Sequence, residues 1–422
     1  HRYALCAPTG RAAKRLAEAT GREAQTIHRL LEFAPGQRDV RYDESFPLPV
    51  DFLVVDEASM LDLRLTHRLL KAVDLPAHVL LVGDVDQLPS VGAGDVLRDV
   101  IGSGLVSVVH LDEIFRQAAD SGIVVNAHRV NRGDSPICND GFRDFYLFAE
   151  ENPAKAADLV VDIVARRIPR KFGIVPADVQ VIAPMYRGDC GIDALNQRLQ
   201  TALNPPASNK AERRLAHRVL RVGDRVMQTV NDYDRAVFNG DVGSVVTIDL
   251  DREEIVVQMD GRGVVYFWSD LNELTHAYAV SVHKSQGSEY PVVVMPVLSQ
   301  HYVMLQRNLL YTAITRAKRL VVLVGTRQAI AIAVRNDETR ERYSGLLRRL
   351  RDATLYTFEF RVDNRVVARR KVPREALLRR TDDALAWRDG RVERAAYVWG
   401  PGLIRSAVCS LTQHDIERRI AV

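Results

Sequence analysis

Two adjacent carboxylates directly follow a short apolar segment in the first part of the chain. Asp56 and Glu57 come after the segment FLVV at residues 52–55. A buried strand of this kind, in a parallel sheet, ends at the edge where α/β proteins bind ligands. One carboxylate there can hold Mg²⁺, while the next orients or deprotonates the water that attacks a γ-phosphate. The alternative is that the acidic pair only caps the helix that follows.

A second apolar segment, residues 79–82, leads into the polar stretch GDVDQLP at residues 83–89. If its strand lies next to strand 52–55, Gln87 lies close to Asp56 and Glu57. A neutral amide can hydrogen-bond a terminal phosphate or an attacking water without repelling either. Taken alone, DQLP is equally an ordinary turn. Two polar strand ends in succession nevertheless favour a shared site.

Two arginines and one polar loop extend this pattern. Arg116 precedes a predicted helix, and Arg316 lies on a helix just before strand 320–324. Arginine suits the charge that develops on a transferring phosphoryl group, because its fork is planar and permanently charged. The loop SVHKSQGSE at residues 281–289 could bind phosphate through main-chain N–H groups. The alternatives are a surface salt bridge for each arginine and a plain turn for the loop.

These residues need a scaffold of alternating strands and helices. Short apolar segments, each followed by a helical pattern, predict strands at residues 3–6, 52–55, 79–82, 179–183, 292–295 and 320–324. The patterns between them predict helices at residues 10–18, 63–73, 191–203 and 308–316. This alternation, with strands that are apolar on both faces, predicts α/β domains with parallel sheets. The strands fall into two clusters, which indicates two sheets.

Residues 218–272 show a different pattern, of short alternating strands with Asn-Gly at residues 239–240 and Asp-Gly at residues 260–261. Both dipeptides favour hairpin turns, so we expect a small antiparallel β-barrel inserted into the second α/β domain. A second insert, residues 33–49, is long enough for a protruding hairpin. Residues 352–422 have no clear period and remain unassigned.

Composition excludes several classes of protein. The 422 residues are 47% hydrophobic and 27% charged, and no apolar segment is long enough to cross a bilayer. The four cysteines are far apart, which gives no indication of a zinc site or a disulfide framework, and no signal peptide is evident. We therefore expect a reducing, cytoplasmic compartment. The net charge of +4 is too small to indicate a polyanionic partner, although residues 341–422 carry an excess of positive charge.

The ordered motifs resemble those of superfamily-one DNA helicases, and most closely the RecD-like branch. They are APTGRAA (7–13), TIHRLL (26–31), VVDEAS (54–59), GDVDQLP (83–89), FRQ (115–117), VHKSQGSE (282–289) and YTAITRAK (311–318). VGDRVMQT (222–229), followed by FNGDVG (238–243), resembles the barrel insert of that branch. The resemblance covers roughly residues 1–350.

This resemblance implies two RecA-like domains of the P-loop NTPase type, with ATP and Mg²⁺ between them and single-stranded DNA running across both. The implied boundaries are 1–112 for the first domain, with a strand-separating pin at 33–49, and 113–217 with 273–351 for the second. The barrel insert is 218–272 and the basic C-terminal segment is 352–422. The family also implies movement from 5′ to 3′ and partners that include duplex junctions and other repair or recombination proteins.

The family's functional residues map onto matching positions of this sequence. Asp56 would hold magnesium, Glu57 would activate water, and Gln87 would couple the γ-phosphate to domain movement. Arg116 and Arg316 would be arginine fingers. Gly287 and Glu289 match the nucleotide-side motif of the second domain. The positions that match DNA-facing motifs are Pro8, Thr9, Thr26, His28 and His283.

One departure from the family concerns its phosphate loop. GxxxxGK[ST] is expected just before APTGRAA, but no Gly-Lys-Ser or Gly-Lys-Thr occurs in the 422 residues. Because that loop supplies the β/γ-phosphate contacts, we expect impaired ATP use by this chain alone, and we expect the loop to lie upstream. Two alternatives remain, which are a non-catalytic DNA-binding or assembly subunit with a helicase-like fold and a motor that acts on RNA.

Overall fold

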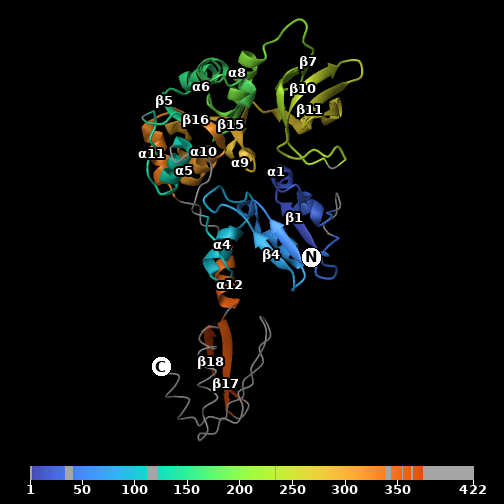
Figure 1. Ribbon diagram of the computed structural model, residues 1–422, viewed down its shortest axis with the longest axis vertical. Helices are drawn as coiled ribbons and strands as arrows, with labels where there is room; N and C mark the ends of the chain where they lie inside the picture. The colour runs from blue at the N-terminus through green and yellow to red at the C-terminus, as the bar shows by residue number, and fades with distance from the viewer. Residues whose placement is uncertain are drawn as a thin grey trace. The chain divides into compact units, whose positions relative to one another are not determined.

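The computed structural model describes residues 2–33, 41–111, 121–139, 141–232, 234–337, 344–353, 355–362 and 365–373. The chain divides into two compact units, one of residues 1–97 with 110–342 and one of residues 98–109 with 343–422. The first unit holds two parallel sheets and an antiparallel sheet (Figure 1). The α/β prediction is therefore confirmed. Among the described residues no helix is long and apolar enough to cross a membrane.

The first parallel sheet has the order β2-β1-β3-β4. Its strands are β1 (Tyr3–Ala7), β2 (Ala24–Thr26), β3 (Phe52–Val55) and β4 (His78–Leu81). They are connected through α1 (Gly10–Thr20), α2 (Ile27–Leu30), the 3₁₀ turn η1 (Ala58–Met60) and α3 (Leu63–Lys71), and α4 (Val96–Ser103) follows β4. Side-chain oxygens of the residues before α1, α2 and α3 accept main-chain N–H groups, as Asp62 does for Leu65 at 2.8 Å.

Strands β3 and β4 are neighbours in parallel register, with Val55 opposite Leu81. The predicted adjacency of the two polar strand ends is therefore confirmed. Gly83 lies where they meet, and a Cβ atom there would lie 2.9 Å from the Ser59 main-chain nitrogen. Only glycine permits this close approach of the two turns, because a side chain would collide with main-chain atoms.

Strand β4 forms one edge of the described sheet and its apolar side chains are not covered. Leu80 is 47% exposed and Val79 is 37% exposed. By contrast, Leu53 and Val55 on β3 are fully buried. As an edge strand, β4 also presents unpaired main-chain groups along its open side within the described sheet.

The second parallel sheet has the order β14-β6-β15-β16-β5. Its strands are β5 (Phe145–Ala149), β6 (Val179–Ala183), β14 (Ala279–Ser281), β15 (Tyr290–Val297) and β16 (Ala317–Gly325). Alternate side chains enter two separate cores, so that Val293 packs on one face and Val294 on the other. This double burial explains why the predicted strands are apolar along almost their whole length, with the buried Gln180 of β6 as an exception.

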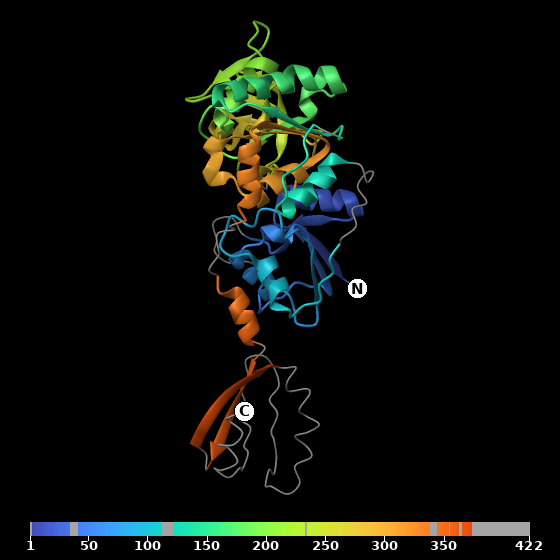
Figure 2. The same ribbon diagram turned by 90° about the vertical axis from the view of Figure 1, so that its left-hand side faces the viewer.

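Helices cover both faces of this second sheet (Figures 1 and 2). The core on one face includes residues of α5 (Gly122–Asn131), α10 (Arg307–Thr315) and α11 (Arg327–Arg335), next to the short α9 (Val282–Ser285). The other core includes α6 (Pro153–Asp162), the π-helical turn η2 (Ile163–Arg167), α7 (Ile168–Phe172) and α8 (Ile192–Leu203). Two further 3₁₀ turns are η3 (Pro176–Asp178) and η5 (Ser299–Met304).

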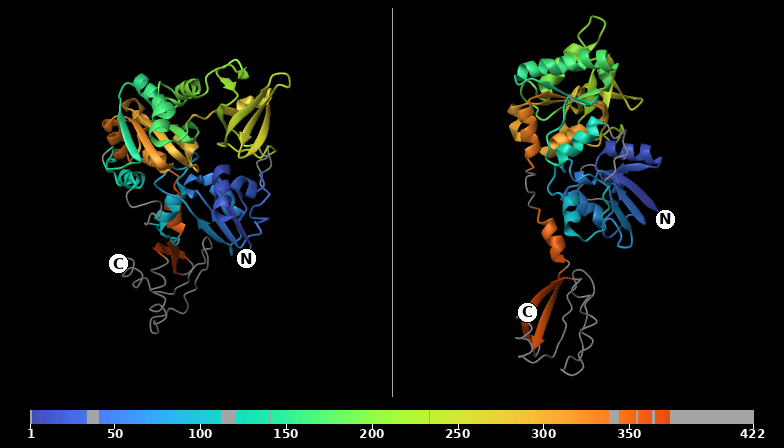
Figure 3. Two further views of the ribbon diagram at one scale, coloured as in Figure 1. Left: turned by 45° about the horizontal axis from the view of Figure 1, so that its top comes forward. Right: turned by 60° about the vertical axis from the view of Figure 1, so that its left-hand side comes forward.

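The antiparallel sheet has the order β12-β11-β10-β9-β13 and lies beside the second parallel sheet (Figure 3). It comprises β9 (Arg225–Gln228), β10 (Val242–Asp249), β11 (Glu254–Met259), β12 (Arg262–Phe267) and β13 (Leu274–His276), with η4 (Trp268–Glu273) before β13 and the hairpin β7 (Glu212–Arg214)–β8 (Val219–Arg221) nearby. The sheet therefore extends past residue 272, where the predicted insert ends. We call the part built on the first parallel sheet (β1–β4) the first lobe. The part built on the second parallel sheet (β5, β6 and β14–β16), with the helices that cover it, is the second lobe. The antiparallel sheet (β9–β13) is the barrel.

The two turn predictions in the barrel have different outcomes. Asp260 and Gly261 form the tight turn between β11 and β12, and both have positive φ, at 50° and 81°. Asn239 and Gly240 form a turn but not a two-residue hairpin, since they lie within the longer connection between β9 and β10. Gly240 there donates its N–H to the Gln228 carbonyl at 2.8 Å, which closes that connection instead.

Two predicted segments lie partly outside the described residues. Of the predicted hairpin at 33–49, residues 34–40 are not described, and residues 41–49 contain no helix or strand. In the second unit, α12 (Leu346–Ala353) crosses the predicted boundary at 351/352. It precedes an antiparallel pair, β17 (Leu355–Val362) and β18 (Arg365–Pro373). Residues 374–422 lie outside the described part of the chain.

Candidate active site between the two lobes

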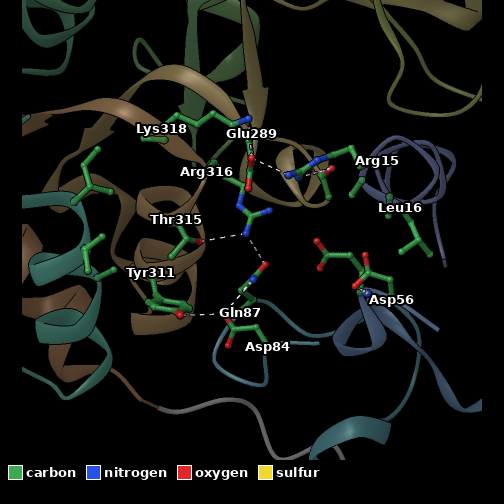
Figure 4. Close-up of a pocket in the computed structure, with 18 of the residues that line it drawn as sticks. Arg15, Leu16, Asp56, Asp84, Gln87, Glu289, Tyr311, Thr315, Arg316 and Lys318 are labelled. Atoms are coloured by element: carbon green, nitrogen blue, oxygen red, sulfur yellow. Dashed lines mark hydrogen bonds and ion pairs between the residues drawn. The ribbon is translucent and has the colours of Figure 1, made fainter. Parts of the chain in front are cut away.

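A cavity of about 1120 Å³ lies between the carboxyl ends of the first sheet and the second lobe. Six predicted site residues line it, namely Asp56, Glu57, Gln87, Gly287, Glu289 and Arg316. Figure 4 shows side chains from both lobes pointing into the same space. The structure thus brings together residues that are up to 260 positions apart in the sequence, from Asp56 to Arg316. Arg116 lies outside the described residues.

Glu57 occupies an unusual main-chain conformation at the end of β3. Its φ is 50° and its ψ is 41°, the left-handed region that a glutamate rarely adopts. The side chain makes no capping hydrogen bond to η1, so the helix-cap alternative is not supported for Glu57. Asp56 stabilises the turn instead, because its Oδ1 accepts the Glu57 N–H at 2.9 Å. The strained turn aims the Glu57 carboxylate into the cavity, a pattern typical of functional sites.

Burial raises the pKa of the Glu57 carboxyl, while the positive charge of Arg316 partly opposes that shift. A carboxylate of raised pKa is a stronger proton acceptor than an ordinary glutamate. Asp56 and Asp84 nearby add to the rise through charge repulsion. The site therefore offers one carboxylate suited to accept a proton from water.

Arg316 follows directly after α10 and is almost completely buried, with 5% of its surface exposed. Its Nη2 donates to the Gln87 Oε1 across the two lobes at 2.9 Å. Its other acceptors are the Thr312 and Ser288 carbonyls and the Thr315 hydroxyl, each at 3.3 Å. All four acceptors are neutral groups, so these hydrogen bonds leave the guanidinium charge unneutralised. Burial lowers the pKa of Arg316, while the negative charges of Glu57 and Glu289 oppose that shift.

Glu289 lies directly before β15 and forms ion pairs with two cations. Its Oε2 accepts from Arg15 Nη2 at 2.7 Å and from Lys318 Nζ at 2.9 Å. Arg15 also donates to the Gly287 carbonyl at 3.3 Å, and Gly287 has a positive φ of 68°. Because Arg15 belongs to α1, this cluster joins the first lobe to the loop of the second. Three basic side chains, Arg15, Arg316 and Lys318, thus line a cavity that also holds carboxylates.

The predicted DNA-facing residues do not line this cavity. Thr9 and Thr26 occupy the N-cap positions of α1 and α2, where their hydroxyls accept the N–H groups of Ala12 at 3.2 Å and Arg29 at 3.1 Å. The His28 ring packs 4.9 Å from the Phe33 ring, and burial lowers its pKa. Their proposed contact with DNA stays a prediction, as it does for two further residues, Pro8 and His283.

Polar residues that line the cavity but were not among the predicted site residues include Arg15, Asp84, Tyr311 and Lys318. Asp84 Oδ2 accepts both the Tyr311 hydroxyl at 2.9 Å and the Gln87 Nε2 at 3.1 Å. The sequence held a signal for Arg15, because it lies one helical turn after Arg11 of the APTGRAA motif and so shares a helix face with it. Nothing in the sequence alone indicates that Asp84 and Tyr311 meet.

A metal ion held by protein groups alone is not indicated. In the described part of the chain, no group of three or more histidine, cysteine or acidic side chains is placed to bind one. Magnesium in phosphate-binding sites usually needs only one or two carboxylates, because the phosphates and water complete its coordination. The residues around Asp56 fit that requirement, together with the basic side chains that a polyphosphate needs.

Three family models match separate parts of the chain. An AAA domain matches residues 1–93, an ATP-dependent RecD-like DNA helicase SH3 domain matches residues 195–259, and a UvrD-like helicase C-terminal domain matches residues 276–324. The ATP-dependent RecD2 DNA helicase of Deinococcus radiodurans is 39% identical over 82% of this chain. The chain belongs to the RecD-like branch of the superfamily-one helicases.

This RecD-like chain is also similar to other helicase proteins. The RecBCD enzyme subunit RecD of Mycolicibacterium smegmatis is 32% identical over 83% of this chain. The chain spans 46% of the Deinococcus relative and 66% of the Mycolicibacterium one, so it corresponds to only part of each. A solved structure of the Bacteroides Pif1 helicase with ADP-AlF3 and ssDNA is 20% identical, covers 78% of this chain and 84% of that chain, and has a TM-score of 0.47.

Proposed function

We propose that this chain is the motor core of an ATP-dependent DNA helicase that moves 5′ to 3′ along single-stranded DNA. The observation that carries the proposal is the cavity in which Glu57 and Gln87 of the first lobe meet Arg316 of the second. A site shared between two lobes can change shape when ATP binds and when it is hydrolysed. The RecD2 relative, named an ATP-dependent DNA helicase, supports this choice of activity.

Each residue then has a distinct part in hydrolysis. Asp56 would hold Mg²⁺, which neutralises phosphate charge when it is bound. Glu57 orients the attacking water and accepts its proton, helped by its raised pKa. Gln87 contacts the terminal phosphate, and Arg316 stabilises the charge that develops on it. A further cation, Arg116, would act alongside Arg316.

The nucleotide and the DNA would use neighbouring surfaces. Gly287 and Glu289 would contact the nucleotide from the second lobe, while Pro8, Thr9 and Thr26, with His28 and His283, would face single-stranded DNA. Helix α1 connects the two surfaces. Thr9 caps the start of this helix, and Arg15, further along it, pairs with Glu289 in the cavity. Partners in repair or recombination are proposed from the RecBCD subunits among the relatives.

The β/γ-phosphate contacts are proposed to come from residues outside the 422. The sequence contains no Gly-Lys-Ser or Gly-Lys-Thr, and the uncovered edge of β4 offers a place for a further strand beside the cavity. We call this chain preceded by a GxxxxGK[ST] loop the extended protein. The 422-residue chain alone would then bind single-stranded DNA but hydrolyse ATP poorly. A non-catalytic subunit and an RNA motor are the competing functions.

Unwinding assays with defined tails test the proposed function. The extended protein is expected to separate a duplex that carries a 5′ single-stranded DNA tail in the presence of ATP and Mg²⁺. A duplex with a 3′ tail should be unwound much more slowly, and the 422-residue chain serves as the matched control without the loop. Preference for the 3′ tail would reverse the assigned polarity. Unwinding from RNA tails alone would favour the RNA motor, and no unwinding at all would favour the non-catalytic subunit.

A further inference from the structure

A chain of hydrogen bonds crosses the cavity from α10 to the loop after β4. The Tyr311 hydroxyl of the second lobe donates to Asp84 Oδ2 of the first lobe at 2.9 Å. The Gln87 Nε2 donates to the same oxygen at 3.1 Å, and Gln87 Oε1 accepts from Arg316 Nη2 at 2.9 Å. Figure 4 shows Tyr311, Asp84, Gln87 and Arg316 side by side in this order. We name these four residues the Tyr311 relay.

The relay determines which way the Gln87 amide faces. An amide has a donating end and an accepting end, and a 180° flip exchanges them. Asp84 is a carboxylate and can only accept, so it holds the Nε2 end of Gln87. The Oε1 end is therefore left for Arg316, which can only donate. Gln87 is 9% exposed, so little water reaches it to stabilise the flipped orientation.

Asp84 is itself held from two sides. Its Oδ1 accepts the Asp86 N–H at 3.0 Å, which leaves Oδ2 directed at Gln87 and Tyr311. Burial and the neighbouring Asp84 charge raise the pKa of the Tyr311 hydroxyl, so it remains a hydrogen-bond donor at physiological pH. Hydrogen bonds to a charged acceptor are the stronger kind, and Asp84 receives three.

Tyr311 is not required merely to join the two lobes. Leu88 donates its N–H to the Thr312 hydroxyl at 2.9 Å, and Gln286 donates to the Leu88 carbonyl at 2.6 Å. Asn131 also donates to Asp86 Oδ2 at 2.6 Å. These three bonds connect the same loop to the second lobe without touching Asp84. What distinguishes Tyr311 is its partner, the carboxylate that fixes Gln87.

We propose that Tyr311 and Asp84 are positioning residues that hold the Gln87 carbonyl toward Arg316 before nucleotide enters the cavity. The proposal rests on the proposed function, since it assigns Gln87 and Arg316 to one hydrolytic site. Tyr311 and Arg316 lie on the second lobe, whereas Asp84 and Gln87 share one loop of the first. Separation of the lobes would remove the Tyr311 and Arg316 bonds and leave Gln87 held by Asp84 alone.

A double-mutant cycle on the extended protein tests whether Tyr311 acts through Gln87. Tyr311→Phe is expected to lower kcat for DNA-stimulated ATP hydrolysis about tenfold, as loss of one bond to a charged group would, with KM for ATP nearly unchanged. In a Gln87→Ala background the same substitution should have no further effect, because the residue it positions is gone. Additive losses in the double variant would overturn the proposal.

Tyr290→Phe is the matched control. It removes another tyrosine hydroxyl between the lobes, one that accepts from Arg11 at 3.3 Å and lies outside the Tyr311 relay. Its effect, whatever the size, should add to that of Gln87→Ala. A coupling with Gln87 as large as that of Tyr311 would show a general loosening of the lobes instead of a relay.

Hydrogen exchange on the 422-residue chain without nucleotide separates this proposal from the proposed function. Tyr311→Phe and Asp84→Asn are each expected to speed exchange of the Asp86 and Gln87 amides, which bond to Asp84. Exchange in β3 should stay unchanged, which confirms that the fold is retained. Unaltered exchange at Asp86 and Gln87 in both variants would overturn the relay even if the extended protein proves to be an active helicase. Faster exchange in a protein that lacks ATPase activity would leave the relay standing and remove only its catalytic use.

Discussion

Replacement of Glu57 by glutamine in the extended protein is expected to abolish DNA-stimulated ATP hydrolysis while nucleotide still binds. Glutamine keeps the size and the left-handed turn of Glu57 but cannot accept a proton. General-base groups contribute roughly 10²- to 10⁴-fold, so turnover should fall by at least about a hundredfold. Steady-state hydrolysis and equilibrium binding of a fluorescent ATP analogue measure the two quantities separately.

Because Glu57 is buried, its charge can be removed without a loss of stability that would confuse the result. Its pKa is raised because the charged form is disfavoured in the cavity, so the neutral glutamine is tolerated without loss of stability. Glu44→Gln is the matched control, since Glu44 is exposed and pairs with Lys71, and neither residue lines the cavity. Turnover that survives in the Glu57 variant would remove Glu57 from its role as base.

Arg316→Ala is the second substitution with a large expected effect. Arginines that stabilise a transferring phosphoryl group are worth roughly 10³-fold or more in rate, and Arg316 is the buried cation that contacts Gln87. Hydrolysis should fall by about that factor in the extended protein. Quenched-flow measurement of a single turnover distinguishes loss of the chemical step from slow product release.

Stability must be followed in the same variant. Arg316 donates to neutral acceptors only, so its removal takes a hydrogen-bond donor from no carboxylate. It does remove the positive charge that partly opposes the raised pKa of buried Glu57. We therefore expect a modest fall in melting temperature. Arg319→Ala is the control, since Arg319 is exposed on β16 three residues further along. Retained hydrolysis with a large loss of stability in the Arg316 variant would assign Arg316 a purely structural role.

Strand and helix positions were largely predictable because their signals are local. Residues 179–183 were predictable as a strand because a short, mainly apolar segment suits a sheet covered on both faces, and all five residues are buried. Residues 52–55 carry the same local signal, although only Leu53 and Val55 of that strand are buried. Their polar ends then had to meet, since parallel neighbours share one edge. Asp56, Glu57 and Gln87 could be placed together on that basis alone.

Contacts between the lobes could not be predicted in the same way. Tyr311 and Asp84 are far apart in the chain, and their pairing depends on how α10 packs against the loop after β4. The same holds for Arg15 and Glu289, which meet only because α1 lies against the second lobe. The Asn-Gly at residues 239–240 was assigned wrongly as a hairpin turn because a dipeptide signal does not specify how far apart its flanking strands are.

The central claim is that the cavity between the lobes hydrolyses ATP in response to single-stranded DNA. It is tested most directly by the rate of ATP hydrolysis of the extended wild-type protein, measured at fixed Mg²⁺ with and without single-stranded DNA. The proposed function predicts a low basal rate that single-stranded DNA raises many-fold, and a smaller response to RNA of the same sequence. A rate that is negligible under both conditions, or that DNA does not change, would contradict the claim.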